Sequence, residues 1–391
     1  MKKIFALGVV LNALLLLGIC ARQRPIVKAE TGGGAAASSC TTKNGDTNAD
    51  HVVDISDAVK ILEYLFLGGT APAPFCEAQE KHVPVAIDPG DLLDPGFDAA
   101  PAINQAILDA NGGRVVLGAG IYRLRTPIRI DREGTILQGC SRGGRLADRN
   151  DGGTVLLASL PDMDMIEVTK RYVTITDLSI DGNELAKRGI RADISKGILQ
   201  GVTITRTTFA GLHLRDSPSG RAFSWRVLTS AIFDNRGYGV LADQIAGNDT
   251  HIGYSVLSGN DGIALHVSGP STTVTVISCD LENNCRSTTE ETAHIFLGQG
   301  VENVRIQGCH FENDAAVPEE SSSFVRARGP SSVLVIEGCY FNDATNRLAG
   351  IRIPDGGFAR IVRVRECIFK GRRTLFDVVP GTDFVASDND T

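Results

Sequence analysis

Short runs in which apolar and polar residues alternate recur from about residue 165 to the C-terminus, at intervals of about 22 to 32 residues. Each segment opens with a run such as GIRADI at Gly189 or GIRIPD at Gly350, and a second run such as VTVISCDL at Val274 follows. Alternation with a period of two is typical of a β-strand with one buried face. Strands that return at a fixed period predict a β-solenoid, in which each segment forms one coil stacked on the previous coil.

One small residue stands at nearly the same place in each segment. The last four segments place a cysteine there, namely Cys279, Cys309, Cys339 and Cys367, and earlier segments are aligned with Thr207, Ser230 and Ser255. A disulfide framework would not tolerate serine and threonine at equivalent places, and a metal site would need ligands clustered within one loop. The alternation points this position inward, so we expect a ladder of buried, unlinked thiols on coils ~5 Å apart.

The segment before the repeats differs from them, because its pattern predicts a helix from about Asp98 to Asn111. Asp98 supplies an N-cap and Gly112-Gly113 ends the helix. The order D-x-A-x-x-x-x-x-A-I, then G-G-x-V-x-L-x-x-G-x-Y, then TILQGCSRGG resembles the start of pectate-lyase-like proteins of the rhamnogalacturonase or epimerase type. The resemblance covers residues 86–391. It implies an all-β fold, a right-handed parallel β-helix with an N-terminal capping helix.

The first residues carry two lysines and then an apolar run, which is the layout of a secretory signal peptide. We assign residues 1–29 to this signal, with cleavage after Ala21 or Ala29, and residues 30–45 to a linker. The sequence therefore predicts a protein that is secreted or held at the cell surface or in the periplasm, where disulfides are allowed. The net charge of −7 argues against general affinity for nucleic acid.

Residues 46–76 contain a second distinct pattern. Oxygen ligands fall at the positions of an EF-hand calcium loop, with a backbone carbonyl from Val52 among them: Asp46, Asn48, Asp50, Val52, Asp54 and Asp57. His51 replaces the glycine expected at position six, which impairs the turn. Cys40 and Cys76 bracket the unit. The segment resembles a single dockerin type I repeat, which implies bound calcium and a cohesin-like or cell-surface partner. The alternative is an acidic, solvated loop before a helix. Residues 77–85 are assigned to a second linker.

Residues that face outward from the first strand of each coil should stack into two columns on the surface. We align the first as Glu167, Arg191, His213, Leu241, Ala264, Phe296, Arg326 and Arg352, and the second as Thr169, Asp193, Arg215, Asp243, His266, Gly298, Arg328 and Pro354. Carbohydrate-active β-helix proteins bind their polysaccharide along such a face. Arginines on an acidic protein favour an anionic ligand, because guanidinium pairs with carboxylate or sulfate.

The candidate catalytic residues are Asp193, Asp243, His213, His266 and Arg215, and the candidate substrate-binding residues are Arg191, Arg326, Arg328 and Arg352. Hydrolysis would use Asp193 and Asp243 as acid and base. β-Elimination from a uronate would use Arg215, His213 or His266 as base. The motif set of polygalacturonases is absent. The expected function is an exported polysaccharide lyase or hydrolase acting on an anionic polysaccharide. The alternative is a non-catalytic β-helix that binds glycans or serves in surface assembly or adhesion.

Overall fold

The computed structural model describes residues 82–85, 91, 94, 96–142, 153–194, 196–217, 220–243, 248–286, 293–314, 323–328, 331–344, 349–353, 359–370, 374–378 and 383–389. The predicted signal peptide, the linker over 30–45 and the dockerin-like segment lie outside these residues. The compact unit that contains the described part of the chain spans Lys81–Thr391. Within the described residues, no helix is long and apolar enough to cross a membrane.

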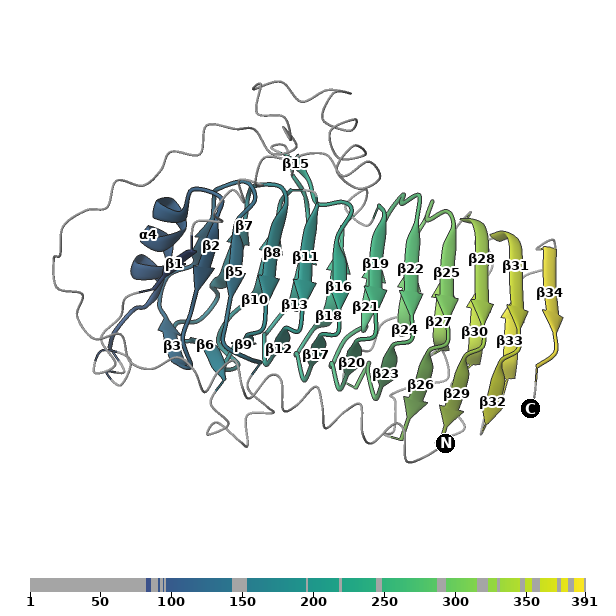
Figure 1. The fold of residues 1–391 in the computed structure, drawn as a ribbon. Coiled ribbons are helices and arrows are strands. Elements are labelled where there is room, and N and C mark those ends of the chain that lie inside the picture. The colour runs from purple at the N-terminus through teal and green to yellow at the C-terminus, as the bar shows by residue number, and fades with distance from the viewer. Residues whose placement is uncertain are drawn as a thin grey trace, which may run out of the picture. The chain divides into compact units, whose positions relative to one another are not determined.

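The unit is a parallel β-solenoid whose coils contribute strands to three long sheets (Figure 1). Sheet A contains β1 (His82–Pro84), β2 (Arg114–Val116), β5 (Ile136–Gln138), β8 (Val173–Thr176), β11 (Gly197–Gln200), β16 (Arg226–Leu228), β19 (Thr250–Gly253), β22 (Val274–Ile277), β25 (Val304–Gln307), β28 (Ser331–Glu337), β31 (Ala359–Arg365) and β34 (Asp383–Ser387). Each strand pairs with the equivalent strand of the next coil, as Thr275 pairs with Arg305. Each coil therefore contacts only its neighbours in the stack.

The other two sheets run alongside. Sheet B contains β3 (Gly120–Leu124), β6 (Thr154–Ala158), β9 (Ser179–Asp181), β12 (Thr203–Thr205), β17 (Ala231–Phe233), β20 (Val256–Ser258), β23 (Asp280–Glu282), β26 (His310–Asn313), β29 (Tyr340–Asp343) and β32 (Ile368–Lys370). Sheet C contains β4 (Ile128–Ile130), β7 (Asp164–Val168), β10 (Arg188–Ala192), β13 (Ala210–Leu214), β18 (Tyr238–Ala242), β21 (Leu265–Val267), β24 (Ala293–Leu297), β27 (Ser323–Ala327), β30 (Ala349–Ile353) and β33 (Thr374–Val378). A small hairpin joins β14 (Asp216–Ser217) to β15 (Gly220–Arg221).

The second alternating run of each coil forms two strands rather than one. WRVLTSAIF, for example, divides into β16 on sheet A and β17 on sheet B. Thr229 lies between them with a φ of 47°, and Tyr254, Ser278, Gly308 and Gly338 hold equivalent left-handed positions with φ between 51° and 61°. A single left-handed residue turns the chain to the next sheet, and the alternation of buried and exposed residues resumes directly after it.

The interior of the solenoid is filled by one contiguous apolar core. In the C-terminal coils Phe311, Phe341 and Phe369 stack with their ring centroids 4.7 Å apart. Trp225 is fully buried and lies against Gly197, where an added Cβ would come within 2.3 Å of the indole ring. Each coil therefore supplies side chains that fit the coil before it.

The cysteine ladder is present, and its four thiols are buried and unlinked, as predicted. Each thiol donates to the carbonyl two residues before it, for example Cys309 Sγ to Gln307 O at 3.4 Å. Ser255 occupies the same place and donates to Gly253 O at 2.8 Å. Serine and cysteine are equivalent here because both have one small side chain that can donate to this carbonyl.

The alignment of Thr207 with this ladder is wrong. The residue at that place in its coil is Val202, whose amide donates to Ser230 Oγ. Thr207 instead begins a second buried ladder, in which its amide and hydroxyl donate to Asn235 Oδ1 at 3.0 and 2.8 Å. Asn235 donates to Asn260 and Asn260 to Asn284 in the same way. The side-chain oxygens of these asparagines accept hydrogen bonds from backbone amides at the turn between sheets B and C, where strand pairing stops.

The predicted helix is present as α4 (Ala100–Ala110) and lies beside the first coils (Figure 1). It packs against β1, β2 and β4, and its buried face includes Ile103 and Ile107. Asp98 accepts a hydrogen bond from the amide of Ala100 at 3.1 Å. Asn111 adopts a left-handed conformation, and Gly112, with φ of 92°, approaches the Glu133 carbonyl so closely that a Cβ would lie 2.5 Å from it.

We predict that alkylation of the native, unreduced protein leaves the four ladder thiols unmodified, because all four are at most 2% exposed. After unfolding in denaturant without reductant, each should take one equivalent of reagent, as mass spectrometry of the peptides would show. A peptide that carries two of these cysteines as a disulfide would contradict the prediction.

Candidate functional site

The outward residues of sheet C form the columns that the sequence predicts, with one shift in register. The first column is continuous through the strand pairs Glu167–Arg191–His213–Leu241–His266–Phe296–Arg326–Arg352. His266 thus belongs to this column, in the place predicted for Ala264. Its predicted place in the second column is taken by Ser268, whose amide bonds to Ala242 O. A shift of two residues preserves the inward and outward alternation, so the pattern alone does not fix it.

A buried carboxylate organises the first coils of this face. Asp164 on β7 is 8% exposed and binds Arg188 at 2.9 Å through one oxygen and Arg191 at 2.7 Å through the other. Burial opposes the charge on Arg191, but Glu167, Asp193 and Asp164 outweigh it and raise the pKa of Arg191. Arg191 is therefore held by acidic side chains of its own protein rather than being offered to a ligand.

A chain of hydrogen bonds runs from Arg188 to Asp243. Arg188 Nε donates to His213 Nδ1 at 2.7 Å, so the proton of the neutral imidazole lies on Nε2, which donates to Asp243 Oδ2 at 3.0 Å. Burial opposes ionisation of Asp243, but the hydrogen bond from His213 and the charges of Arg215 and Arg188 outweigh it and lower the pKa of Asp243. His213 is 4% exposed and acts as a positioning residue for the more exposed carboxylate.

The second column brings Asp193, Arg215 and Asp243 together at the ends of β10, β13 and β18. Arg215 Nη1 lies 3.7 Å from Asp193 Oδ1, and the guanidinium side chain is 35% exposed. Asp193 also lies 3.3 Å from Arg191 Nε. Asp193 and Asp243 are two strands apart, about 10 Å by strand spacing, with the Arg215 strand between them.

An aromatic row crosses the same face beside these charges. We use this name for Phe209, Tyr238, His266 and Phe296, whose successive ring centroids are 5.8, 5.2 and 4.7 Å apart. The Arg188 guanidinium lies 5.1 Å from the Phe209 ring centre. Burial lowers the pKa of His266 to about 4, with a smaller opposing effect from the charge of Asp243. Among the described residues, no hydrogen-bond partner reaches His266 Nδ1.

The C-terminal arginines divide into three environments. Arg326 is 5% exposed and pairs in register with Phe296 and Arg352. Arg352 Nε donates to Asp377 on β33 at 2.7 Å. Asp377 lies outside the two columns that were predicted from the sequence. Arg328 is exposed, one strand position beyond Ala327. The predicted arginine cluster is thus present in the fold, and one of its charges is already neutralised within the sheet.

Sequence reasoning missed Asp164, Arg188, Phe209 and Tyr238. Each lies at or just before the start of its strand, outside the alternating part of the run that places side chains on a face. The signal that could have found them is the recurrence of a polar or aromatic residue three places before the first column, at Asp164, Arg188 and Tyr238.

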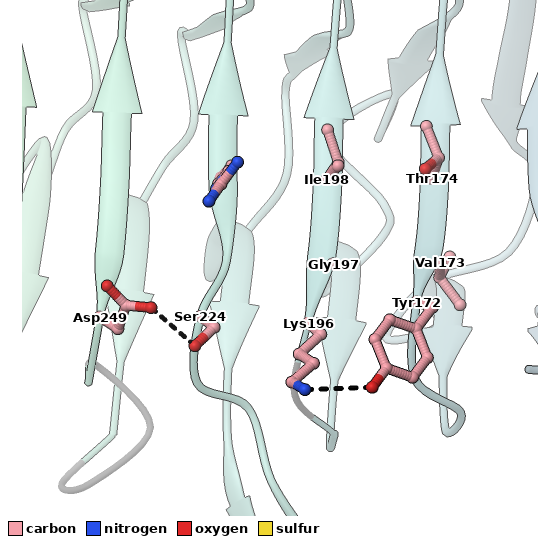
Figure 2. A pocket seen from close by; sticks show the side chains of 9 residues that line it. Tyr172, Val173, Thr174, Lys196, Gly197, Ile198, Ser224 and Asp249 are labelled. Atoms are coloured by element: carbon pink, nitrogen blue, oxygen red, sulfur yellow. Dashed lines mark hydrogen bonds between the residues drawn. The ribbon is translucent and has the colours of Figure 1, made fainter. Parts of the chain in front are cut away.

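A pocket of about 360 Å³ lies on sheet A, away from these residues (Figure 2). Its wall is built at the starts of β8, β11, β16 and β19. Lys196 Nζ donates to the Tyr172 hydroxyl at 3.0 Å and lies 4.9 Å from the centre of that ring. The Ser224 hydroxyl donates to Asp249 at 2.8 Å on the opposite side (Figure 2). The pocket is mixed in charge, since Arg226 also lines it.

No protein-family model matches the chain, and no curated protein matches it in sequence. Several solved structures resemble it. The tailspike gp49 of Acinetobacter baumannii bacteriophage Fri1, a capsular polysaccharide depolymerase, has a TM-score of 0.57 at 14% identity over 82% of this chain and 61% of its own. ORF18 of Geobacillus virus E2 has a TM-score of 0.56 at 15% identity over 86% of this chain and 63% of its own.

The A-module of the mannuronan C-5 epimerase AlgE4 from Azotobacter vinelandii has a TM-score of 0.50 at 16% identity, over 78% of this chain and all of its own length. The chain spans less than two thirds of the two viral proteins. At this level of identity the likeness shows the fold alone. The described part of the chain is therefore a parallel β-solenoid that shares its fold with this epimerase module and with the phage tailspike.

Proposed function

We propose that the protein is a carbohydrate-active β-helix that binds an anionic polysaccharide across sheet C and cleaves it by β-elimination. The observation that carries this proposal is His266. Its imidazole is neutral above a pH of about 4, and its buried Nδ1 has no hydrogen-bond partner among the described residues, which leaves Nε2 as the ring nitrogen that can meet a ligand. It stands beside the strand that carries Asp243 and within the aromatic row.

Elimination from a uronate removes the proton on the carbon α to the carboxylate. The glycosidic oxygen on the β carbon then leaves, and a double bond forms between the two carbons. The step needs a base, and it needs a cation that neutralises the carboxylate as charge develops on it. The His266 imidazole supplies the base through Nε2, because Nδ1 is buried and cannot meet a substrate. Arg215, the partly exposed guanidinium of the second column, supplies the cation, because its fork of N–H groups matches a carboxylate.

The rings and the charges have separate roles in this arrangement. The partly exposed faces of Phe209 and Tyr238 offer apolar surface to sugar rings, while Asp243 and Arg215 bind the polar groups of the sugar. The proposal agrees with the activities of two proteins of similar structure, one an epimerase of mannuronan and one a capsular polysaccharide depolymerase. Both act on polysaccharides.

Hydrolysis by Asp193 and Asp243 fits the geometry less well. A separation of about 10 Å is at the upper end for an inverting pair, which also needs room for water and substrate between the carboxyl groups. The Arg215 strand lies between the two, and Asp193 is already engaged by Arg191 and Arg215. A protein that binds the polysaccharide on this face without cleaving it is the second candidate, favoured by the absence of the polygalacturonase motif set from the sequence.

Export and the calcium loop at Asp46–Asp57 remain predictions from the sequence. We propose that the loop binds calcium and that the unit attaches the protein to a partner at the cell surface. Calcium binding by a fragment of residues 30–85 would test this proposal by calorimetry, because such loops fold as they bind metal.

The first test concerns binding of the polysaccharide. We expect Arg215→Ala to weaken binding of a polyuronate oligosaccharide by about 10- to 100-fold, because one charge-assisted contact contributes about 1.5–3 kcal/mol. Calorimetry at low salt would measure the dissociation constant. Arg305→Ala is the matched control, since Arg305 is 52% exposed on sheet A and pairs with Glu337. Equal affinities of both variants would contradict a sheet C site.

A further inference from the structure

A group of potential metal ligands lies on sheet B, on two neighbouring coils. Asp280 and Glu282 lie on β23 and His310 lies on β26, with Asp280 paired in register with His310. One ligand atom from each of the three side chains lies within 4.8 Å of the others. All three side chains are partly exposed, so that an ion and its water ligands have access.

The two nitrogens of His310 face different carboxylates. Nδ1 lies 3.1 Å from Asp280 Oδ1, and Nε2 lies 3.7 Å from Glu312 Oε2. Asn342 on the next coil donates to the other oxygen of Glu312 at 2.6 Å. A histidine that binds a metal with one nitrogen commonly donates its second N–H to a carboxylate, which fixes the tautomer and the ring. Glu312, which accepts a hydrogen bond from Asn342, lies at ion-pair distance from Nε2, and Nδ1 is directed toward Asp280.

The charge balance of the group points the same way. Among the described residues, His310 is the only basic side chain that pairs with Asp280 or Glu312, and none pairs with Glu282. Some other carboxylates of the solenoid have arginine partners; Glu337 on sheet A, for instance, lies between Arg305 and Arg365. Three carboxylates that share one imidazole leave an excess of negative charge, which a divalent cation would offset.

We propose that Asp280, Glu282 and His310 Nδ1 bind one divalent transition-metal ion, with Zn²⁺ as the best fit, and that Glu312 and Asn342 orient the histidine. Three protein ligands that include imidazole, with a water in the fourth position, suit Zn²⁺. Calcium prefers six to eight oxygens and does not favour imidazole. The ion would join the coils of β23 and β26 on a face other than sheet C, so its role is to hold adjacent coils together.

Zn²⁺ titration of the full-length, chelator-treated protein tests the proposal. Calorimetry and metal analysis after dialysis should show one Zn²⁺ more per chain in the wild type than in His310→Ala or Asp280→Asn. Glu312→Gln should keep that site and weaken it by about 10- to 100-fold. Zn²⁺ should also raise the melting temperature of the wild type and not that of His310→Ala. His251→Ala, on β19 of sheet A, is the control and should retain the full stoichiometry.

Two outcomes would overturn the site. One is equal Zn²⁺ stoichiometry and affinity in the wild type, His310→Ala and Asp280→Asn, since any bound ion would then lie elsewhere on the chain. The other is a site that depends on Asp280 and Glu282 and not on His310, because a purely carboxylate site would favour calcium. Circular dichroism of each variant verifies that the solenoid has formed, and Asp280→Asn decides the question if His310→Ala does not fold.

Discussion

Replacing His266 with glutamine should lower the turnover of a polyuronate by about 10²- to 10⁴-fold, the usual contribution of a positioned general base. Glutamine has a similar length and polarity but does not accept the proton. KM should change little, because Arg215 and the other binding residues remain. The absorbance of the unsaturated product measures the rate. His251→Gln, a histidine of sheet A, is the matched control and should keep wild-type turnover.

The pH profile offers a second readout of the same residue. Because the pKa of His266 is lowered to about 4, the imidazole is protonated only in strongly acidic solution. Turnover should therefore rise with pH through about 4 and be independent of this group near neutrality. Full activity of His266→Gln would exclude the base role. Binding of the oligosaccharide without any unsaturated product, by the wild-type protein, would favour the non-catalytic candidate.

The fold could be predicted from the sequence because a solenoid repeats one local pattern. A strand that alternates and returns at a fixed interval has one favourable arrangement, which is to stack on its previous copy. The positions of Arg191, His213, Phe296 and Arg326 on one column followed from this pattern and are confirmed. The strand count per coil did not follow, since the left-handed residue between β16 and β17 is a threonine, an unusual residue for that conformation.

The site was less predictable, for a related reason. Alternation fixes which face a residue occupies, but a shift of two residues along the strand leaves every residue on the same face, so the pattern does not distinguish the two registers. His266 was placed in the wrong column for this reason, and its contacts with Tyr238 and Phe296 were missed. The pairing of Asp164 with Arg188 and Arg191 depends on three-dimensional proximity between coils, as does the bond between Arg352 and Asp377. No local pattern encodes such cross-coil pairs.

The acid stability of the solenoid should depend strongly on His294. This side chain lies in the core beside Phe311 and Phe324, and burial lowers its pKa to about 4 despite the hydrogen bond to Leu281 O. Nδ1 donates that bond, and Nε2 has no partner among the described residues. Protonation of Nε2 would therefore place a charge in an apolar interior with nothing to accept its hydrogen bond.

The folded-state pKa of His294 lies below its ordinary value of 6.5, so the unfolded chain binds the proton more tightly. The stability that the neutral imidazole contributes is fully present above pH 6.5 and is lost as the pH falls from 6.5 toward 4. Over this interval the loss is about 3 kcal/mol, which is the pKa difference at about 1.4 kcal/mol per unit. His294→Phe should reduce the pH dependence of the free energy of unfolding by about this amount.

Urea unfolding at pH 7 and pH 4.5 measures the effect as a difference between the two conditions. The phenylalanine in the His294→Phe variant would extend the ring contacts of Phe324 and Phe311, so the variant should fold. Phe324→Leu is the matched control: it alters the packing at the same place without a titratable group, and should change stability equally at both pH values. A His294→Phe variant that loses as much stability on acidification as the wild type would show that other groups, such as His266, cause the loss. The acid limit of this solenoid would then not be set by its core histidine.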